Sequence, residues 1–271
     1  MGAGVAEVAA AAGYDVVLRS RHQDTADAML AGLAKSLGRQ VEKEKRTQAE
    51  ADAIAGRVKA TTHLGELVDV DLVIESVVED LGVKKALFAE LDSVCKPGAI
   101  LATNTSTLPV VELAMATGRP DLVCGIHFFN PAPAMSLVEV VRPITAADAT
   151  VAAALAFAES CGKEPVEVKD QAGFIVNALL FPYLNNAVRL LEQGVATKEG
   201  IDAAMKGGCG FPLGPFALLD LVGLDTSLAI LDALYDEFRD PNYAAMPLLR
   251  RLVTSGQLGR KAGRGFYDYA R

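Results

Sequence analysis

The 271-residue sequence lacks the features that mark several large classes of protein. Its 26 Lys and Arg residues are outnumbered by 34 Asp and Glu residues, which gives a formal net charge of −8. Proteins that bind nucleic acids depend on an excess of basic charge, so this deficit argues against that class. The sequence also has no apolar run of the roughly 18 residues that a membrane-spanning helix needs. We therefore expect neither a nucleic-acid partner nor a membrane partner.

Cysteine is scarce, and Cys95, Cys124, Cys161 and Cys209 are too far apart to form a C-x-x-C pair. Zinc sites and disulfide frameworks need closely and regularly spaced cysteines. The sequence therefore predicts no metal site, and we expect a reducing cytoplasm as the compartment. The apolar start, Met1–Asp15, has no basic region before it and runs into a strand, so it does not resemble a signal peptide.

Short strands and helices alternate over the first 170 residues. A helix is expected at about 81–94, a shorter one at 108–117, and a long charged helix over 24–57. Strands are expected at Asp15–Arg19, Val58–Thr61, Leu72–Glu75, Ile100–Thr103, Val123–Phe128 and Leu137–Arg142. Strands separated by helices are typical of βαβ units and a parallel sheet. The sequence predicts an α/β domain over residues 1–170.

The pattern is helical after Asp170. One long helix is expected over Phe174–Gln193, interrupted near Pro182, and further helices at about 197–205, 218–221 and 228–238. Residues 171–271 therefore form an all-α domain in this prediction. Its apolar side chains exceed what one small bundle can bury, which suggests a homodimer formed through this domain.

A dinucleotide-binding motif is only partly present. Such a fold opens with a strand and the motif G-x-G-x-x-G, whose glycines let the backbone approach a pyrophosphate. Here the chain starts Met1-Gly2-Ala3-Gly4, so at most the last glycine of the motif is present, and Gly2 is the candidate for the cofactor. We expect a doubly wound, Rossmann-like sheet whose first strand is missing, with a gap at its centre. We also expect the true start to lie upstream, with Met1 inside the motif.

The end of the next strand indicates which dinucleotide is bound. Arg19, Ser20 and Arg21 stand where an NAD-binding fold usually has an acidic residue for the ribose 2′-hydroxyl. Arginine and serine suit a 2′-phosphate instead. The cofactor is therefore NAD or NADP, and these residues favour NADP.

A histidine and a glutamate lie inside neighbouring apolar strands. His127 is in Gly125–Phe129, and Glu139 is in Leu137–Val141, with a Pro-Ala-Pro turn between the two segments. A hairpin would bring them together, and each would then stabilise the charged form of the other, which suits proton transfer. Thr103-Asn104-Thr105-Ser106 follows another strand, where α/β sheets place ligand groups.

Several segments together resemble the 3-hydroxyacyl-CoA dehydrogenases. They are DLVIESVVED (71–80), ATNTSTL (102–108), GIHFFNPAPAMSLVEVV (125–141), KDQAGFIVNALLFPYLNNA (169–187), GFPLGPFALLDLVGLDT (210–226) and GRKAGRGFYDY (259–269). The resemblance covers nearly the whole chain and is greatest to the single-function, short-chain 3-hydroxybutyryl-CoA type. It implies an oxidoreductase that interconverts (S)-3-hydroxyacyl-CoA and 3-ketoacyl-CoA with NAD(P).

The resemblance also implies roles for individual residues. His127 corresponds to the family's catalytic acid/base and Glu139 to the carboxylate that orients it. Ser106 and Asn177 match the hydroxyl and the amide that contact the substrate oxygen, so both are also substrate-binding.

Further positions correspond to the cofactor and coenzyme A contacts of the family. Glu79 and Lys84 match positions near the nicotinamide, and Asn104 is assigned to the cofactor with them. Ser36 and Lys43 match the helical arm that contacts coenzyme A in the acyl-CoA substrate.

Two other interpretations stay open. One is a related hydroxyacid dehydrogenase, of the 3-hydroxyisobutyrate or gulonate type, although HFFNP followed by LVEVV favours the acyl-CoA enzyme. The other is a cofactor-free binding protein, which gains weight if the chain really begins at Met1.

Overall fold

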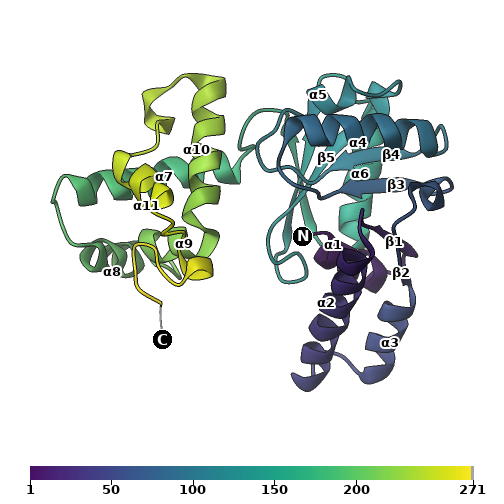
Figure 1. The fold of residues 1–271 in the computed structure, drawn as a ribbon, viewed down its shortest axis with the longest axis horizontal. Helices are drawn as coiled ribbons and strands as arrows, with labels where there is room; N and C mark the ends of the chain where they lie inside the picture. The colour runs from purple at the N-terminus through teal and green to yellow at the C-terminus, as the bar shows by residue number, and fades with distance from the viewer. Residues whose placement is uncertain (270–271) are drawn as a thin grey trace. The chain divides into compact units, whose positions relative to one another are not determined.

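The computed structural model describes residues 1–269 and divides the chain into two compact units. One begins at Met1 and ends at Asp170, and the other begins at Gln171. The first unit contains the strands and the second is helical (Figure 1). In the portion of the chain that the structure describes, no helix is both long enough and apolar enough to cross a bilayer.

The strands of the first unit form two sheets. They are β1 (Val16–Arg19), β2 (Val58–Thr61), β3 (Leu72–Glu75), β4 (Ile100–Thr103), β5 (Val123–Phe128), β6 (Leu137–Arg142) and β7 (Glu164–Lys169). β1 and β2 pair in parallel, and a separate sheet has the order β3-β4-β5-β6-β7. Only the β5–β6 pair is antiparallel. The mixed, mainly parallel α/β fold is as predicted, and the break between the two sheets is where the sequence led us to expect a gap.

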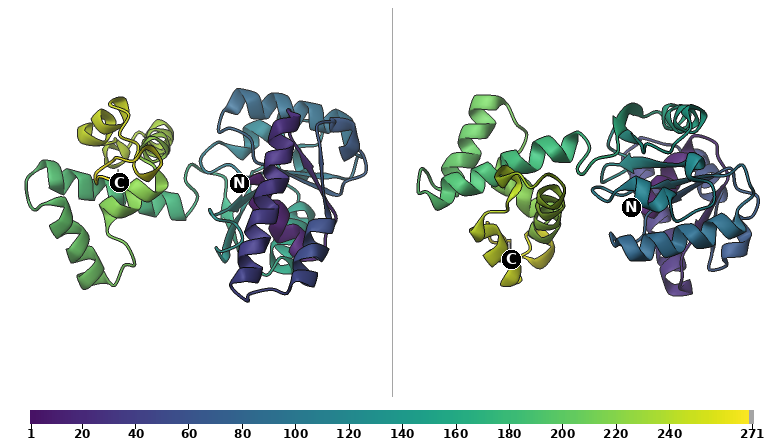
Figure 2. Two further views of the ribbon diagram at one scale, coloured as in Figure 1. Left: turned by 60° about the horizontal axis from the view of Figure 1, so that its bottom comes forward. Right: turned by 90° about the horizontal axis from the view of Figure 1, so that it is seen from above.

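Helices cover both faces of the five-stranded sheet. The α1 helix (Gly2–Ala11) and the α6 helix (Asp148–Ser160) share one apolar cluster with strands β4 to β6. The α4 helix (Leu81–Val94) lies on the opposite face from α6 (Figures 1 and 2). The predicted helix at 108–117 is shorter in the structure, because α5 spans only Val110–Ala114. Both faces of the sheet are thus buried, which explains the nearly continuous apolar strands.

The long helix predicted over residues 24–57 is wrong, because the segment forms two helices. α2 covers Gln23–Glu42 and lies over one side of the first unit in Figure 2, and α3 covers Gln48–Gly56. A new helix starts at Thr47, whose hydroxyl accepts a hydrogen bond from Glu50 N while the Glu50 carboxylate accepts one from Thr47 N. This reciprocal capping box pairs backbone N–H groups that have no partner at the start of a helix. It therefore favours a new helix, α3, after Thr47 instead of the continuation of α2.

The second unit is a bundle around one apolar core. Its helices are α7 (Val176–Glu192), α8 (Lys198–Cys209), α9 (Pro215–Val222), α10 (Leu224–Phe238) and α11 (Pro247–Thr254). The interruption predicted at Pro182 is wrong, because α7 continues through it. Proline removes one backbone donor, but Phe181, Leu184 and Val188 on the same helix are buried in the core and hold it in place.

Two buried aspartates fasten the chain in the second unit. Asp202 accepts hydrogen bonds from Phe216 N at 2.8 Å and from Tyr267 Oη at 2.9 Å. Burial, and then the bond to Asp202, raise the pKa of the Tyr267 hydroxyl, so it stays a donor. The aspartate therefore holds the start of α9 and the C-terminal segment together.

Asp220, on α9, has the same role for the C-terminal segment. Its carboxylate accepts from Phe266 N and Tyr267 N, both at 2.8 Å. Gly265 lies directly against it, since a Cβ at that position would be 2.0 Å from Asp220 Oδ1. The glycine of the GRGFYDY segment is therefore required by packing.

We expect Gly265→Ala to lower the free energy of unfolding by about 3 kcal/mol, because the methyl group displaces a buried carboxylate. Gly207→Ala is the matched control, since nothing lies within 4 Å of a Cβ in that helical position. The control should be neutral or stabilise the protein by up to about 1 kcal/mol. Urea unfolding followed by circular dichroism measures both, and equal stabilities would contradict the packing argument.

Candidate functional site

The carboxyl ends of three neighbouring strands carry the polar residues of the site. β3 ends at Glu75, β4 at Thr103 and β5 at Phe128, next to His127. Asn104 joins them, because its N–H donates to Glu75 O at 2.8 Å and its Oδ1 accepts from Phe128 N at 2.7 Å. In open α/β sheets ligands bind beyond this edge. In the structure Asn104 therefore holds the strand ends in register.

The predicted hairpin between His127 and Glu139 is present. β5 and β6 pair antiparallel with His127 directly opposite Glu139. Glu139 Oε2 lies 2.8 Å from His127 Nδ1, and the two residues are 1% and 4% exposed. An ionised carboxylate only accepts hydrogen bonds, so Nδ1 is the donor in this pair. In neutral imidazole the proton then sits on Nδ1, and Nε2 is an acceptor.

Ser106 lies on the other side of the imidazole. Its Oγ is 3.1 Å from His127 Nε2, which makes a line from Ser106 through His127 to Glu139. The ring of Phe129 packs against the imidazole with 4.6 Å between ring centroids. The arrangement fixes both the plane of the ring and the roles of its two nitrogens.

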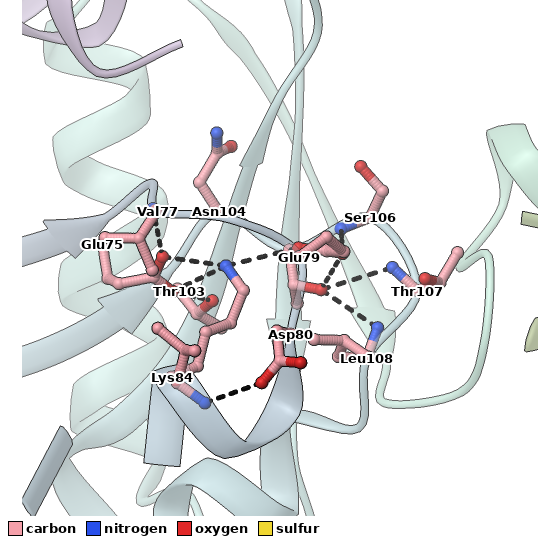
Figure 3. A network of polar contacts seen from close by, with 12 residues as sticks. Glu75, Val77, Glu79, Asp80, Lys84, Thr103, Asn104, Ser106, Thr107 and Leu108 are labelled. Atoms are coloured by element: carbon pink, nitrogen blue, oxygen red, sulfur yellow. Dashed lines mark hydrogen bonds and ion pairs between the residues drawn. The ribbon is translucent and has the colours of Figure 1, made fainter. Parts of the chain in front are cut away.

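Lys84 and Glu79 belong to a network beside this line (Figure 3). Lys84, on the first turn of α4, is fully buried and contacts both Glu75 oxygens, at 2.8 and 2.9 Å. Its Nζ is also 3.3 Å from Glu79 Oε2. Glu79 Oε1 accepts from Ser106 N at 2.8 Å. Glu79 thus contacts Ser106 directly, and Lys84 contacts Glu79. The sequence reasoning missed Glu75, although a glutamate at the end of the apolar strand LVIE was a signal for it.

The residues predicted for the dinucleotide lie at the start of α1 and the end of β1. Gly2 is in the first turn of α1, where a Cβ would be 4.0 Å from Leu18 and from Ser76. Helix starts present backbone N–H groups to anions. At the end of β1, Arg19 Nε is buried and has no hydrogen-bond partner among the described residues, 1–269.

Ser20 N continues the pairing with β2 by donating to Thr61 O at 3.0 Å, while Arg21 is exposed. The orphaned guanidinium nitrogen of Arg19 fits an anionic group of a cofactor, because a buried donor without an acceptor is costly. These residues therefore fit a dinucleotide.

A cavity of about 460 Å³ lies between α1, α2 and the loop at residues 130–134. Ser36 lines it, while Lys43 is exposed at the end of α2 and is not among the lining residues. The sequence reasoning missed Gln40 and Lys45, which line the cavity too. The spacing of Ser36 and Gln40 was a signal, since residues four apart share a helix face.

Asn177 belongs to the helical unit. It is 7% exposed and lies in the first turn of α7. Its contact with the substrate stays a prediction.

Two family patterns cover the chain. The description "3-hydroxyacyl-CoA dehydrogenase, NAD binding domain" matches residues 1–171, and "3-hydroxyacyl-CoA dehydrogenase, C-terminal domain" matches residues 173–269.

Proteins named as dehydrogenases of this kind are similar to this chain over most of their own lengths. A 3-hydroxybutyryl-CoA dehydrogenase of Clostridioides difficile is 48% identical, covering 99% of this chain and 96% of the relative. The human mitochondrial hydroxyacyl-coenzyme A dehydrogenase is 42% identical, covering 99% and 88%. The crystal structure of (S)-3-hydroxybutyryl-CoA dehydrogenase PaaH1 from Ralstonia eutropha superposes with a TM-score of 0.97 at 41% identity, covering 100% of this chain and 96% of that one.

Cys124 lies on β5, three residues before His127, and its thiol is not suited to chemistry at the site. Its side chain is buried, and burial raises the pKa of the thiol to about 12. Only the thiolate is an effective nucleophile. Cys209, at the end of α8, is exposed.

We expect iodoacetamide at pH 8 to alkylate Cys209 while Cys124 stays unmodified, because Cys124 is both buried and protonated. Peptide mass spectrometry of the folded protein measures the modification at each residue. Labelling after denaturation is the control and should reach all four cysteines. Alkylation of Cys124 in the folded protein, at a rate similar to Cys209, would contradict the buried placement of β5.

Proposed function

The chain belongs to the 3-hydroxyacyl-CoA dehydrogenase family, and we propose that it interconverts (S)-3-hydroxyacyl-CoA and 3-ketoacyl-CoA with NAD(P), with 3-hydroxybutyryl-CoA as the principal substrate. The observation that carries the proposal is the line formed by Ser106, His127 and Glu139, with distances of 3.1 and 2.8 Å. A buried base, held by a carboxylate and facing a hydroxyl, suits the removal of a proton from an alcohol.

His127 is the acid/base in this proposal. Its Nε2 accepts the proton of the substrate 3-hydroxyl in oxidation and returns it to the 3-keto oxygen in reduction. When bound, the nicotinamide accepts or supplies the hydride at C3. Glu139 keeps the proton on Nδ1 and stabilises the imidazolium that forms, as its 2.8 Å contact supports.

The substrate oxygen needs donors as its charge develops. Ser106 Oγ is already within hydrogen-bond distance of His127 Nε2, so an oxygen bound there can contact both groups. Asn177 supplies a second donor in the proposal, through its side-chain amide. Preorganised donors of this kind stabilise the transition state.

The 3-hydroxybutyryl-CoA substrate is suggested by the names of the relatives from Clostridioides difficile and Ralstonia eutropha. Ser36 on the wall of the cavity, with Lys43 and Lys45 near the end of α2, is proposed to contact the coenzyme A portion. Two lysines near the end of α2 suit its phosphates.

NADP is the proposed dinucleotide. The buried Nε of Arg19 has no partner among residues 1–269, and Ser20 and Arg21 follow it at the end of β1. Gly2, in the first turn of α1, is proposed to let the helix start approach the pyrophosphate. Glu79 is the proposed residue nearest the nicotinamide, with Asn104 and Lys84 close to it.

We propose a homodimer formed through the helical unit, in the cytoplasm. The helical unit exposes several large apolar side chains, and those of Leu179, Val195 and Leu221 are 72%, 65% and 50% exposed. Such surface is typical of an interface between subunits. The four cysteines are free, which agrees with a reducing compartment.

We expect the purified protein to reduce acetoacetyl-CoA and not free acetoacetate, with NADPH used in preference to NADH. Arg19→Leu should raise the KM for NADPH by about tenfold and leave the KM for NADH within about twofold, since one charged hydrogen bond is lost. Steady-state rates with both reduced cofactors measure this. Equal use of free acetoacetate would favour a hydroxyacid dehydrogenase, and equal effects of Arg19→Leu on both cofactors would contradict the NADP assignment.

We expect His127→Ala to lower kcat for acetoacetyl-CoA reduction by about 10³-fold, and Glu139→Gln by about 10²-fold, because proton transfer loses its base or the orientation of that base. The melting temperature and circular dichroism spectrum report on the fold. His63→Ala is the control, since His63 is exposed in a loop. Turnover near the wild-type value in either site variant would refute the role of His127.

A further inference from the structure

The polar network of Figure 3 lies beside the proposed proton-transfer residues, and the mechanism above uses only its end at Ser106. Its charged members are Glu75 at the end of β3, Lys84 in the first turn of α4, and Glu79 in the loop between them. We refer to these three residues as the Glu75–Lys84–Glu79 network.

Lys84 faces inward completely. Its side chain is 1% exposed, and its ammonium contacts Glu75 Oε1 at 2.8 Å, Glu75 Oε2 at 2.9 Å and Glu79 Oε2 at 3.3 Å. An ammonium has three N–H donors, and three carboxylate oxygens surround this one. Lys84 thus presents no surface to a ligand and acts on neighbouring side chains.

Glu75 is satisfied on both oxygens. Thr103 Oγ1 donates to Oε2 at 2.8 Å, and Val77 N donates to Oε1. Glu75 is 4% exposed and lies on a strand of the sheet, so the position of its carboxylate is fixed. Lys84, which is bound to Glu75, in turn holds Glu79, whose side chain is 40% exposed.

Glu79 in turn organises the loop that carries Ser106. Its Oε1 accepts from Ser106 N at 2.8 Å and from the hydroxyl of Thr105. The same Thr105 hydroxyl accepts from Leu108 N at 3.0 Å. Glu79 therefore binds Ser106 N directly and Leu108 N through the Thr105 hydroxyl.

We propose that Glu75, Lys84 and Thr105 are positioning residues of the reaction, which act through Glu79 to hold Ser106 Oγ within hydrogen-bond distance of His127 Nε2. This inference rests on the proposed function. In this proposal Lys84 acts on the reaction through Glu79 and does not contact the cofactor itself. The acid/base pair is thereby held from two directions: Glu139 fixes His127, and the Glu75–Lys84–Glu79 network fixes Ser106.

The physical reason lies in how steeply a proton-transfer step depends on distance. Displacing a reacting group by about 1 Å can lower a rate by about 100-fold. Ser106 is in a loop, and loops are mobile unless their backbone groups are fixed. A carboxylate held by a buried cation supplies that fixation at Ser106 N.

A double-mutant cycle between Thr105→Val and Ser106→Ala tests the proposal. Thr105→Val keeps the shape of the side chain and removes the hydroxyl that joins Glu79 to Leu108 N. We expect it to lower kcat for acetoacetyl-CoA reduction by about 10- to 100-fold, with a smaller effect on the KM values. In the Ser106→Ala background the same change should alter kcat by less than about twofold, because the group being positioned is already absent.

Thr107→Val is the matched control, since Thr107 contributes its backbone N–H to the network and not its hydroxyl. It should retain kcat within about twofold. The double variant Glu75→Gln/Lys84→Met removes the buried pair without leaving a buried charge unpaired, since Glu79, which also loses its contact with Lys84, is 40% exposed. Its loss of kcat should also vanish in the Ser106→Ala background. Thermal melts show whether this variant folds, and the Thr105 cycle does not depend on it.

Equal losses from Thr105→Val in both backgrounds, or no loss in either, would overturn the positioning role. A Ser106→Ala protein with full activity would overturn it as well, and the proposed function would still stand on the wild-type turnover. A wild-type protein that does not reduce acetoacetyl-CoA would contradict the proposed function itself, and the positioning role with it.

Discussion

The antiparallel pairing of β5 with β6 is the contact on which the site depends. It opposes His127 and Glu139 across one ladder, with both side chains buried. Shifting the register by one residue would turn every side chain of β6 to the other face of the sheet. A buried carboxylate and a buried imidazole would then each lose a partner, at a cost of several kcal/mol. The apolar side chains of both strands and the turn between them fix this register.

Buried carboxylates are used in the same way throughout the chain. Glu75 and Glu139 in the first unit, and Asp202 and Asp220 in the second, are each at most 7% exposed. Glu75 and Glu139 each bond a side chain directly opposite on the neighbouring strand. Asp202 and Asp220 accept hydrogen bonds from the distant C-terminal segment, so they join parts of the chain that the helices alone would not connect. Removing one partner of such a bond destabilises the protein strongly, because an unpaired buried charge is far more costly than a lost apolar contact. Because the paired arrangement is so strongly favoured, buried carboxylates are suited to holding catalytic groups in place.

The sequence by itself determined the fold class and most of the strands. β3, β4, β5 and β6 begin and end where short apolar runs predicted them, because apolar runs and turn residues are local signals. It also predicted the hairpin that joins His127 to Glu139, from two charged groups in neighbouring apolar strands and a Pro-Ala-Pro turn. The resemblance to the dehydrogenase family was carried by contiguous segments, which need no structure to recognise.

Only the tertiary structure decided which distant groups meet. The passage of α7 through Pro182 depends on packing against the bundle core. The Thr47–Glu50 capping box that divides residues 23–56 into two helices is, by contrast, a local signal that the sequence prediction missed. Lys84 on α4 contacts Glu75 at the end of β3, and Glu79 in the loop after β3 contacts Ser106 in the loop after β4. No local sequence pattern predicts either contact. Their partners are set by where parallel strands end side by side, which is a property of the whole sheet.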